Sequence, residues 1–335
     1  METRFGGDTQ VKIPVQNISM PDISFSMQLP RDENFSIFIP FHRDMATRLI
    51  EVFMGMRNYD DFLSASVYCR GRVNPYMYVY ALSVAILHRP ETKNLRIPPL
   101  AEIFPGKYVD SSVLVKAREE ANVFSQGTRV PIEISKDRTA SDLEPEHRVA
   151  YFREDIGINL HHWHWHLVFP FSGPRDIVEK DRRGEIFFYM HQQIQARYNF
   201  ERLCNKLGRV KRLHDFREPI PEAYFPKLDN MIASRNWAAR EVDQLVFDIQ
   251  DLERWRDRII EAIQIGRVVN EKGESVELTE QGGIDVLGNM VEATILTINR
   301  NLYGDIHNLA HAALGICHDP DMRHLVSLFN SETYK

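Results

Sequence analysis

Histidine placement is the feature that most restricts what this 335-residue chain can fold into. Four of its thirteen histidines fall within residues 161–166, which read HHWHWH inside the helix-like stretch GINLHHWHWHLVF. Residues four apart share one face of a helix, so His162 and His166 point the same way and the other two histidines point elsewhere. Two imidazoles one turn apart can hold one metal ion, and packing alone does not easily explain histidines interleaved with tryptophans.

A second pair with the same spacing, His307 and His311, lies in LYGDIHNLAHAALG. Taken alone, this pair is as consistent with hydrogen-bonded core residues as with metal ligands. Two pairs on two helices strengthen each other, because facing helices of a bundle build metal sites in their core. His191, in the amphipathic stretch EIFFYMHQQIQARYNF, reads by itself as a core residue and becomes a third ligand only beside the first pair. His318 reads as a capping residue or an outer partner of the site, because an Asp-Pro dipeptide follows it.

The candidate ligands are all imidazoles, which narrows the choice of metal. Neither pair carries the Glu of a HExxH zinc protease, and the ExxH pattern of di-iron bundles is missing. The three cysteines, Cys69, Cys204 and Cys317, are far apart and form neither a disulfide framework nor a zinc pattern. Imidazole ligands suit copper or zinc, and two adjacent all-histidine sites favour paired copper and dioxygen chemistry.

Composition excludes several other classes of protein. With 43% apolar and 26% charged residues the chain can bury a core, and its net charge of −6 does not favour nucleic acid or an acidic membrane surface. The longest apolar run, residues 76–87, is too short to span a bilayer. The first residues, METRFGGDTQ, lack the apolar core of a secretory signal. We therefore expect no nucleic-acid partner, no membrane partner and no signal peptide.

The fold class predicted from hydrophobic periodicity is mainly α, a helical N-terminal domain followed by a helical-bundle metal domain. The polar, turn-rich stretch 125–146 marks the boundary, which gives domains of residues 1–130 and 131–335. VKIPVQNISM and ENFSIFIP read as extended segments. Helices are expected over residues 43–56, 60–69, 75–88, 109–124, 147–168, 181–207, 241–265, 280–298 and 302–316.

Three runs make the chain resemble the arthropod prophenoloxidases of the hemocyanin and phenoloxidase superfamily, which have type 3 copper centres. They are FREDIGINLHHWHWHLVFPF, RRGEIFFYMHQQIQARYNFERLCN and NRNLYGDIHNLAHAALGICHDPDMRH. The likeness extends over nearly all of the sequence. It implies a hemocyanin-type helical domain over 1–130 and a hemocyanin-type copper domain over 131–335, and the C-terminal immunoglobulin-like domain of the family is absent from this sequence.

The resemblance also implies a ligand set and an activity. His162, His166 and His191 would bind the first copper (CuA), and His307 and His311 would bind the second (CuB). Enzymes of this family use O₂ at the dicopper centre to hydroxylate monophenols and to oxidise o-diphenols to quinones, which leads to melanin in innate immunity and wound healing. The chain is thus expected to be a copper-dependent oxidoreductase and monooxygenase of the phenoloxidase or tyrosinase type.

Control of the enzyme is implied in the same way. Arg4 and Phe5, in TRFGGD, resemble the Arg-Phe bond that a serine protease cuts to activate the zymogen. Phe38, in FSIFIP, resembles the phenylalanine that occupies the copper pocket as a substrate mimic, with Phe35 as the competing choice and core packing as the ordinary alternative. Asn308 is expected to orient a water that deprotonates the phenol. The family is often oligomeric and acts outside the cell, in hemolymph, after release without a signal.

The sequence departs from the family in its C-terminal part. The third CuB histidine, the acidic residue proposed as catalytic base and the β-sandwich have no counterpart, as in a fragment, a truncated gene model or a splice form. We therefore expect reduced stability, low solubility and weak or absent oxidase activity for this chain alone. The alternatives are a hemocyanin-like oxygen carrier and a non-catalytic decoy or storage relative.

Overall fold

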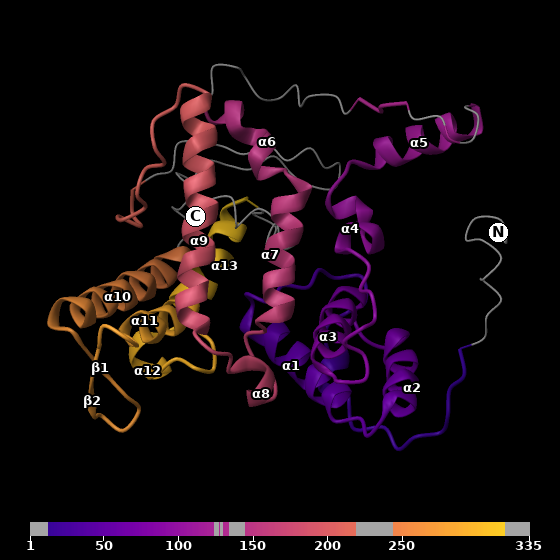
Figure 1. Ribbon diagram of the computed structural model, residues 1–335, viewed down its shortest axis with the longest axis horizontal. Coiled ribbons are helices and arrows are strands. Elements are labelled where there is room, and N and C mark those ends of the chain that lie inside the picture. The colour runs from indigo at the N-terminus through magenta and orange to yellow at the C-terminus, as the bar shows by residue number, and fades with distance from the viewer. Residues whose placement is uncertain (1–12, 124–126, 128–129, 134–144, 219–243, 319–335) are drawn as a thin grey trace.

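The computed structural model describes residues 13–123, 127, 130–133, 145–218 and 244–318, and they form a mainly helical protein, as predicted (Figure 1). The described residues also contain one short antiparallel hairpin, β1–β2, in which Val268 lies opposite Val276. It lies between α10 and α11 in the sequence. The elements are α1 (Pro40–Met54), α2 (Tyr59–Arg70), α3 (Pro75–His88), α4 (Leu100–Ile103), α5 (Ser111–Val123), α6 (Ala150–Arg153), α7 (Ile156–Val168), α8 (Arg175–Val178), α9 (Arg183–Cys204), α10 (Gln244–Ile265), β1 (Arg267–Val269), β2 (Ser275–Glu277), α11 (Gly283–Glu292), α12 (Arg300–Tyr303) and α13 (Ile306–His318).

Helices α1, α2 and α3 pack together at one side of the molecule. The predicted stripe of α1 is buried, with Met45, Leu49 and Phe53 fully shielded from solvent. Asn74 caps α3 through its Oδ1, which accepts the backbone N–H groups of Tyr76 and Met77 at 3.0 and 3.2 Å. The core that these helices form continues through residues of α7 and α8, so the N-terminal helices and the histidine-bearing region share one hydrophobic core.

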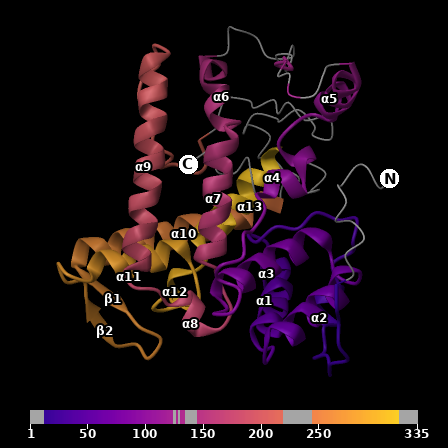
Figure 2. The same cartoon turned by 45° about the vertical axis from the view of Figure 1, so that its right-hand side comes forward.

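Helices α7 and α9 form an antiparallel hairpin through α8 and run side by side in both views (Figures 1 and 2). The first turn of α9 crosses α11, and α13 packs against both α10 and α11. Two glycines allow the close crossing of α9 and α11, because a Cβ at Gly184 would overlap the backbone of Asp285, and one at Gly288 would overlap that of Gly184. This arrangement directs helices α7, α9 and α13 toward one region of the core.

Three of the predicted helices are wrong in their extent. Residues 147–168 do not form one helix: η5 (Pro145–Val149) and α6 end before Asp155, whose Oδ1 accepts the Ile158 N–H at 2.8 Å and starts α7 as a new helix. The helix expected over 280–298 ends at Glu292, because Ala293 adopts a left-handed conformation with φ of 58°. The helix expected over 302–316 is interrupted at Gly304, where the ring of Trp255 occupies the space of a side chain.

Two N-terminal segments are expected to be extended. In the described structure residues 13–20 have neither helix nor strand, and residues 33–40 lead through a turn into the first residue of α1, so neither segment joins a sheet. The hairpin β1–β2 was not predicted, although its turn, N-E-K-G, carries a glycine at the left-handed position, Gly273 with φ of 80°. No helix of the described residues is both long and apolar enough to cross a membrane. The predicted boundary at 125–146 falls mostly on residues outside the described part of the chain.

Candidate metal centre

Helix α7 presents one pair of histidines to the core. His162 and His166 are 3% and 1% exposed, and their ring centres lie 4.8 Å apart. His161 and His164, on the other faces of the same helix, are exposed. The HHWHWH run is therefore divided by helical geometry into a buried pair and a solvent pair, as its spacing predicts.

Helix α9 brings His191 to this pair. The centre of its ring lies 5.4 Å from that of His162. Its Nδ1 is 2.8 Å from the carbonyl oxygen of Phe187, one turn earlier, so Nδ1 carries the proton and donates it. This hydrogen bond leaves Nε2 as the unprotonated nitrogen of a neutral ring, which is the form that binds metals.

Helix α13 supplies the second pair. His307 and His311 are 8% and 2% exposed, and their Nε2 atoms are 3.0 Å apart, a hydrogen bond in which one ring donates to the other. The ring of His307 also lies 6.1 Å from that of His191, centre to centre. Five imidazoles from three helices thus form one continuous cluster, which contains all five histidines singled out from the sequence.

Phe38 lies within this cluster. Its side chain is 1% exposed and stacks on the ring of His311, with 3.9 Å between centres and 11° between planes. It also makes edge-to-face contacts with His166 and His307, whose ring centres lie 5.6 and 6.0 Å from its own. Phe38 therefore contacts imidazoles of both α7 and α13. Phe35, the competing candidate, stacks instead on His42 at 6.1 Å. Of the two phenylalanines, Phe38 is the one that the structure places against the histidines.

Two further aromatic residues line the cluster and were not predicted. Phe187 lies 4.3 Å from His191 and 5.2 Å from His307, centre to centre. Its position four residues before His191 places it on the same helix face, a signal that the sequence did contain. Phe171 stacks on His166 at 5.0 Å, and since it follows α7 in a loop, no periodic pattern marks it. The cluster is therefore enclosed by apolar rings, which exclude water.

Asn308 is buried beside His307, with 1% of its surface exposed. Its Nδ2 donates to Oδ1 of Asp305, and the other carboxylate oxygen, Oδ2, accepts from Arg43 of α1 at 3.0 Å and from Arg300 at 2.7 Å. This network holds the amide in place, and the predicted contact of Asn308 with a catalytic water stays a prediction. Arg4 and Phe5 lie outside the described residues.

The cluster fits a metal in its donor chemistry and its ring spacing. With metal–nitrogen bonds of ~2 Å, the centres of two imidazoles on one ion lie about 5 Å apart. The observed separations of 4.8, 5.4 and 4.5 Å match this spacing. As the side chains stand, no group of three or more His, Cys, Asp or Glu residues in the described ranges is arranged to hold an ion. The fit therefore rests on pairs of neutral imidazoles, the ligands that copper and zinc accept.

The helical fold and the clustered imidazoles are typical of a metal-binding protein with histidine ligands. The chain belongs to the hemocyanin family: residues 99–332 match its copper-containing domain, and residues 8–94 match its all-alpha domain. The resemblance and the fold class predicted from the sequence are thus confirmed. Copper is the metal of this family, and the chain carries the copper domain.

Several curated relatives are phenoloxidases. The chain is 57% identical to phenoloxidase 1 of Holotrichia diomphalia, over 97% of this chain and 49% of that protein. It is 54% identical to phenoloxidase 2 of Drosophila melanogaster, over 98% of this chain and 50% of that protein. The chain thus spans about half the length of the curated relatives it matches.

Two solved structures share the fold. Scorpion hemocyanin in its activated state aligns with a TM-score of 0.81 and 36% identity, over 93% of this chain and 51% of that one. A hemolymph-type prophenoloxidase from a crustacean aligns with a TM-score of 0.79 and 30% identity, over 93% of this chain and 52% of that one.

Proposed function

We propose that this chain forms the copper centre of a phenoloxidase, which hydroxylates monophenols and oxidises o-diphenols with O₂. The observation that carries this proposal is the convergence of five imidazoles from α7, α9 and α13, four of them buried and His191 partly exposed. His162, His166 and His191 are the proposed ligands of one copper, and His307 and His311 are two proposed ligands of the other. Copper, when bound, supplies the electron transfer to O₂.

The protein itself orients the ligands and keeps the site dry. The Nδ1–H of His191 is held by the Phe187 carbonyl, which fixes the ring and the tautomer. Phe171 stacks on His166 and prevents that imidazole from rotating freely. The apolar lining favours a flat aromatic substrate over a charged one, because burial of an uncompensated charge is costly. These contacts support phenols and catechols as the substrate class.

Phe38 is proposed to act as a plug of the substrate site. Its phenyl ring has the size and shape of a phenol, and it stacks on His311 at 3.9 Å, where a substrate ring would meet the second copper. A bound phenol and the Phe38 ring cannot occupy the same space, so the segment before α1 must move before substrate binds. Cleavage between Arg4 and Phe5 by a serine protease is the proposed trigger for this movement.

The remaining expectations rest on relatives. A location in hemolymph is proposed because the crustacean relative is a hemolymph-type prophenoloxidase. Assembly into homo- or hetero-oligomers is kept as a proposal from the family resemblance. The division into residues 1–130 and 131–335 is kept as a proposal. An oxygen-carrier role is the second candidate, supported by the 36% identity to scorpion hemocyanin, but identities of 54% and 57% to phenoloxidases favour the enzyme.

Copper content per chain is the measurement that tests the ligand assignment. His166→Ala removes a buried imidazole, and His164→Ala, on the exposed face of the same helix, is the matched control. We expect His166→Ala to lower the copper content and His164→Ala to leave it unchanged. Equal copper in both variants would contradict the assignment.

Catechol oxidation after limited proteolysis then separates the two functions. A phenoloxidase turns over catechol once the plug has moved, whereas an oxygen carrier shows little turnover. Because only weak turnover is expected for this chain alone, the readout is the change on proteolysis: copper-loaded chain whose catechol oxidation does not rise would contradict the proposed activation while leaving the copper site intact.

A further inference from the structure

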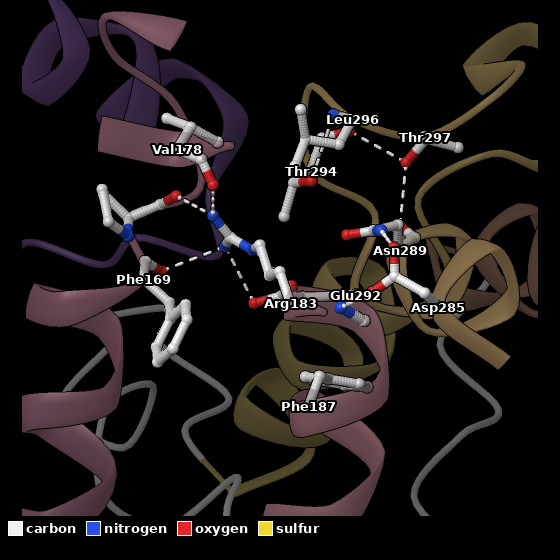
Figure 3. Close-up of polar contacts among 12 residues, drawn as sticks. Phe169, Val178, Arg183, Phe187, Asp285, Asn289, Glu292, Thr294, Leu296 and Thr297 are labelled. Carbon is white, nitrogen blue, oxygen red and sulfur yellow. Dashed lines mark hydrogen bonds and ion pairs between the residues drawn. The ribbon is translucent and has the colours of Figure 1, made fainter. Parts of the chain in front are cut away.

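Arg183, the first residue of α9, is a cation buried completely in the protein, with 0% of its side chain exposed. Its guanidinium makes five hydrogen bonds (Figure 3). Two go to the carboxylate of Glu292, and the other three go to the backbone carbonyls of Phe169 at 3.1 Å, Pro170 at 2.8 Å and Val178 at 2.9 Å. Each of its five N–H groups therefore has an acceptor, as a buried guanidinium requires.

Glu292, the last residue of α11, completes this anchor. Its Oε2 accepts from Nε of Arg183 at 2.8 Å and its Oε1 from Nη2 at 2.9 Å, a bidentate pair that is 0% exposed on both sides. A buried ion pair of this kind adds little net stability compared with apolar side chains, but it fixes the relative geometry of what it joins. The three backbone carbonyls that accept from Arg183 therefore show which segments the guanidinium joins.

These carbonyls belong to the segment that leaves the first imidazole pair. Phe169 directly follows α7 and lies three residues after His166. Phe171, two residues later, stacks its ring on His166 at 5.0 Å. The guanidinium thus holds the end of α7, the start of α9 and the end of α11 at one point.

The crossing of α9 and α11 transmits this constraint to His191. Asp285 of α11 caps α9, since its Oδ1 accepts the N–H groups of Gly184 at 2.7 Å and of Glu185 at 3.3 Å. Close contact between the backbones of Gly184 and Gly288 prevents α9 from sliding along α11. His191 lies seven residues after Gly184, two turns along the same face of α9. The register of α9 therefore decides where its imidazole meets His162.

From this geometry we infer that Arg183 is a positioning residue for the three-imidazole cluster. Together with Glu292 it sets the separation between the α7 imidazoles, His162 and His166, and the α9 imidazole, His191. This inference rests on the proposed role of these histidines as copper ligands. Loosening the anchor should weaken copper binding at this cluster and leave the α13 pair unaffected.

Copper(I) affinity, measured by competition with a chromophoric chelator on the full chain, tests this inference. The main variant is the double substitution Arg183→Met with Glu292→Leu, which removes both charges and keeps apolar volume in the core. Arg183→Lys is the second variant, because it retains a cation opposite Glu292 but cannot reach the three carbonyls at once. The matched control is Arg182→Met with Glu185→Leu, an exposed ion pair at the same turn of α9.

His191→Ala identifies the binding step that belongs to the three-imidazole cluster, and thermal unfolding reports folding of every variant. We expect that step to weaken by about tenfold to a hundredfold in the Arg183 variants, the range for residues that orient ligands, and to stay unchanged in the control. If the double variant does not fold, Arg183→Lys carries the test. Folded Arg183 variants that bind copper like the wild type would overturn the inference. If His191→Ala also binds like the wild type, the ligand assignment itself fails, and the positioning role fails with it.

Discussion

The three imidazoles on α7 and α9 and the two on α13 form one cluster, but different forces hold them. On the α13 side, the helix itself sets the spacing of His307 and His311, four residues apart. On the other side, His191 reaches His162 only because two helices are joined by the Arg183–Glu292 pair and by the Gly184–Gly288 crossing. One group depends on local geometry and the other on tertiary structure.

Although the spacing within the α13 pair is local, the position of the whole helix depends on tertiary contacts. Asp305, immediately before α13, accepts from Arg43 of α1 and from Arg300 of α12. Phe38 precedes α1 and stacks on His311. The α13 side is therefore held by these polar and aromatic contacts as well as by its packing on α10 and α11, whereas the position of His191 depends on the crossing of α9 with α11. Disturbing one set of contacts should affect one group of imidazoles more than the other.

The largest effect is expected from Gly288→Ala, which disrupts the close crossing of α9 and α11 that positions His191. Its Cβ would overlap the backbone of Gly184, and backbone cannot move away without separating the two helices. We expect destabilisation by about 4 kcal/mol or more, measured by urea unfolding. Gly71→Ala, at a position with open space around it, is the control and should change stability by less than about 1 kcal/mol. Similar unfolding midpoints for both variants would show that the crossing is not tight.

Phe38→Ala is expected to affect the α13 side, with a loss of about 3 kcal/mol of stability from the cavity it leaves. Copper-loaded chain should also gain affinity for the catechol probe 4-nitrocatechol, followed by its absorbance. Phe35→Ala removes an equally buried ring that does not stack on the proposed ligands, so it should cost similar stability without that gain. Equal probe affinity in the two variants would contradict the plug.

Asp305→Asn should destabilise the protein less than Phe38→Ala, and its effect should also fall on the α13 pair. It removes the charge that pairs with Arg43 and Arg300, and since Asp305 is 18% exposed we expect a loss of about 1–2 kcal/mol. Copper binding at the α13 pair should weaken more than binding at the three-imidazole cluster. Asp257→Asn, which removes an exposed carboxylate paired with the half-buried Arg256, serves as the control and should change neither property. Equal weakening at both copper sites would show that the two groups are not held separately.

The smallest effect concerns His88, where α3 meets the end of α7. Its Nε2 lies 3.0 Å from Nζ of Lys180 and its Nδ1 2.7 Å from the carbonyl oxygen of Val84. Burial lowers the pKa of His88 below its ordinary value, and the Lys180 cation lowers it further, although the Val84 carbonyl opposes this. Between the ordinary pKa of about 6.5 and the lowered one, the unfolded chain binds more protons, so stability falls as the pH falls.

His88→Gln should make that decline less steep, as measured by the pH dependence of the unfolding free energy from pH 7 to pH 5. His214→Gln, at an exposed position, is the control. An unchanged slope in His88→Gln would show that the pKa of His88 is not lowered in the folded chain.

The sequence was informative wherever one helix decided the outcome. The buried faces of α7 and α13 follow from i,i+4 spacing, and so would the position of Phe187. Contacts between distant segments left no such signal: Arg183 and Glu292 are 109 residues apart, and neither lies in a pattern that marks a buried charge. The break before α7 depends on the capping by Asp155, and the break at Gly304 depends on a tryptophan ring from α10. Local periodicity cannot anticipate these breaks.

The cap of α9 has a consequence for the order in which the protein is made. The carboxylate of Asp285 that closes the first turn of α9 comes from a residue 101 positions later than Gly184. As the chain leaves the ribosome, α7 and α9 emerge long before the helix that locks them, and contacts of such long sequence separation form late in folding. His191 therefore acquires its final position only after α11 has been synthesised and docked. Copper capture by the three-imidazole cluster is, on this basis, a late event in the maturation of the chain.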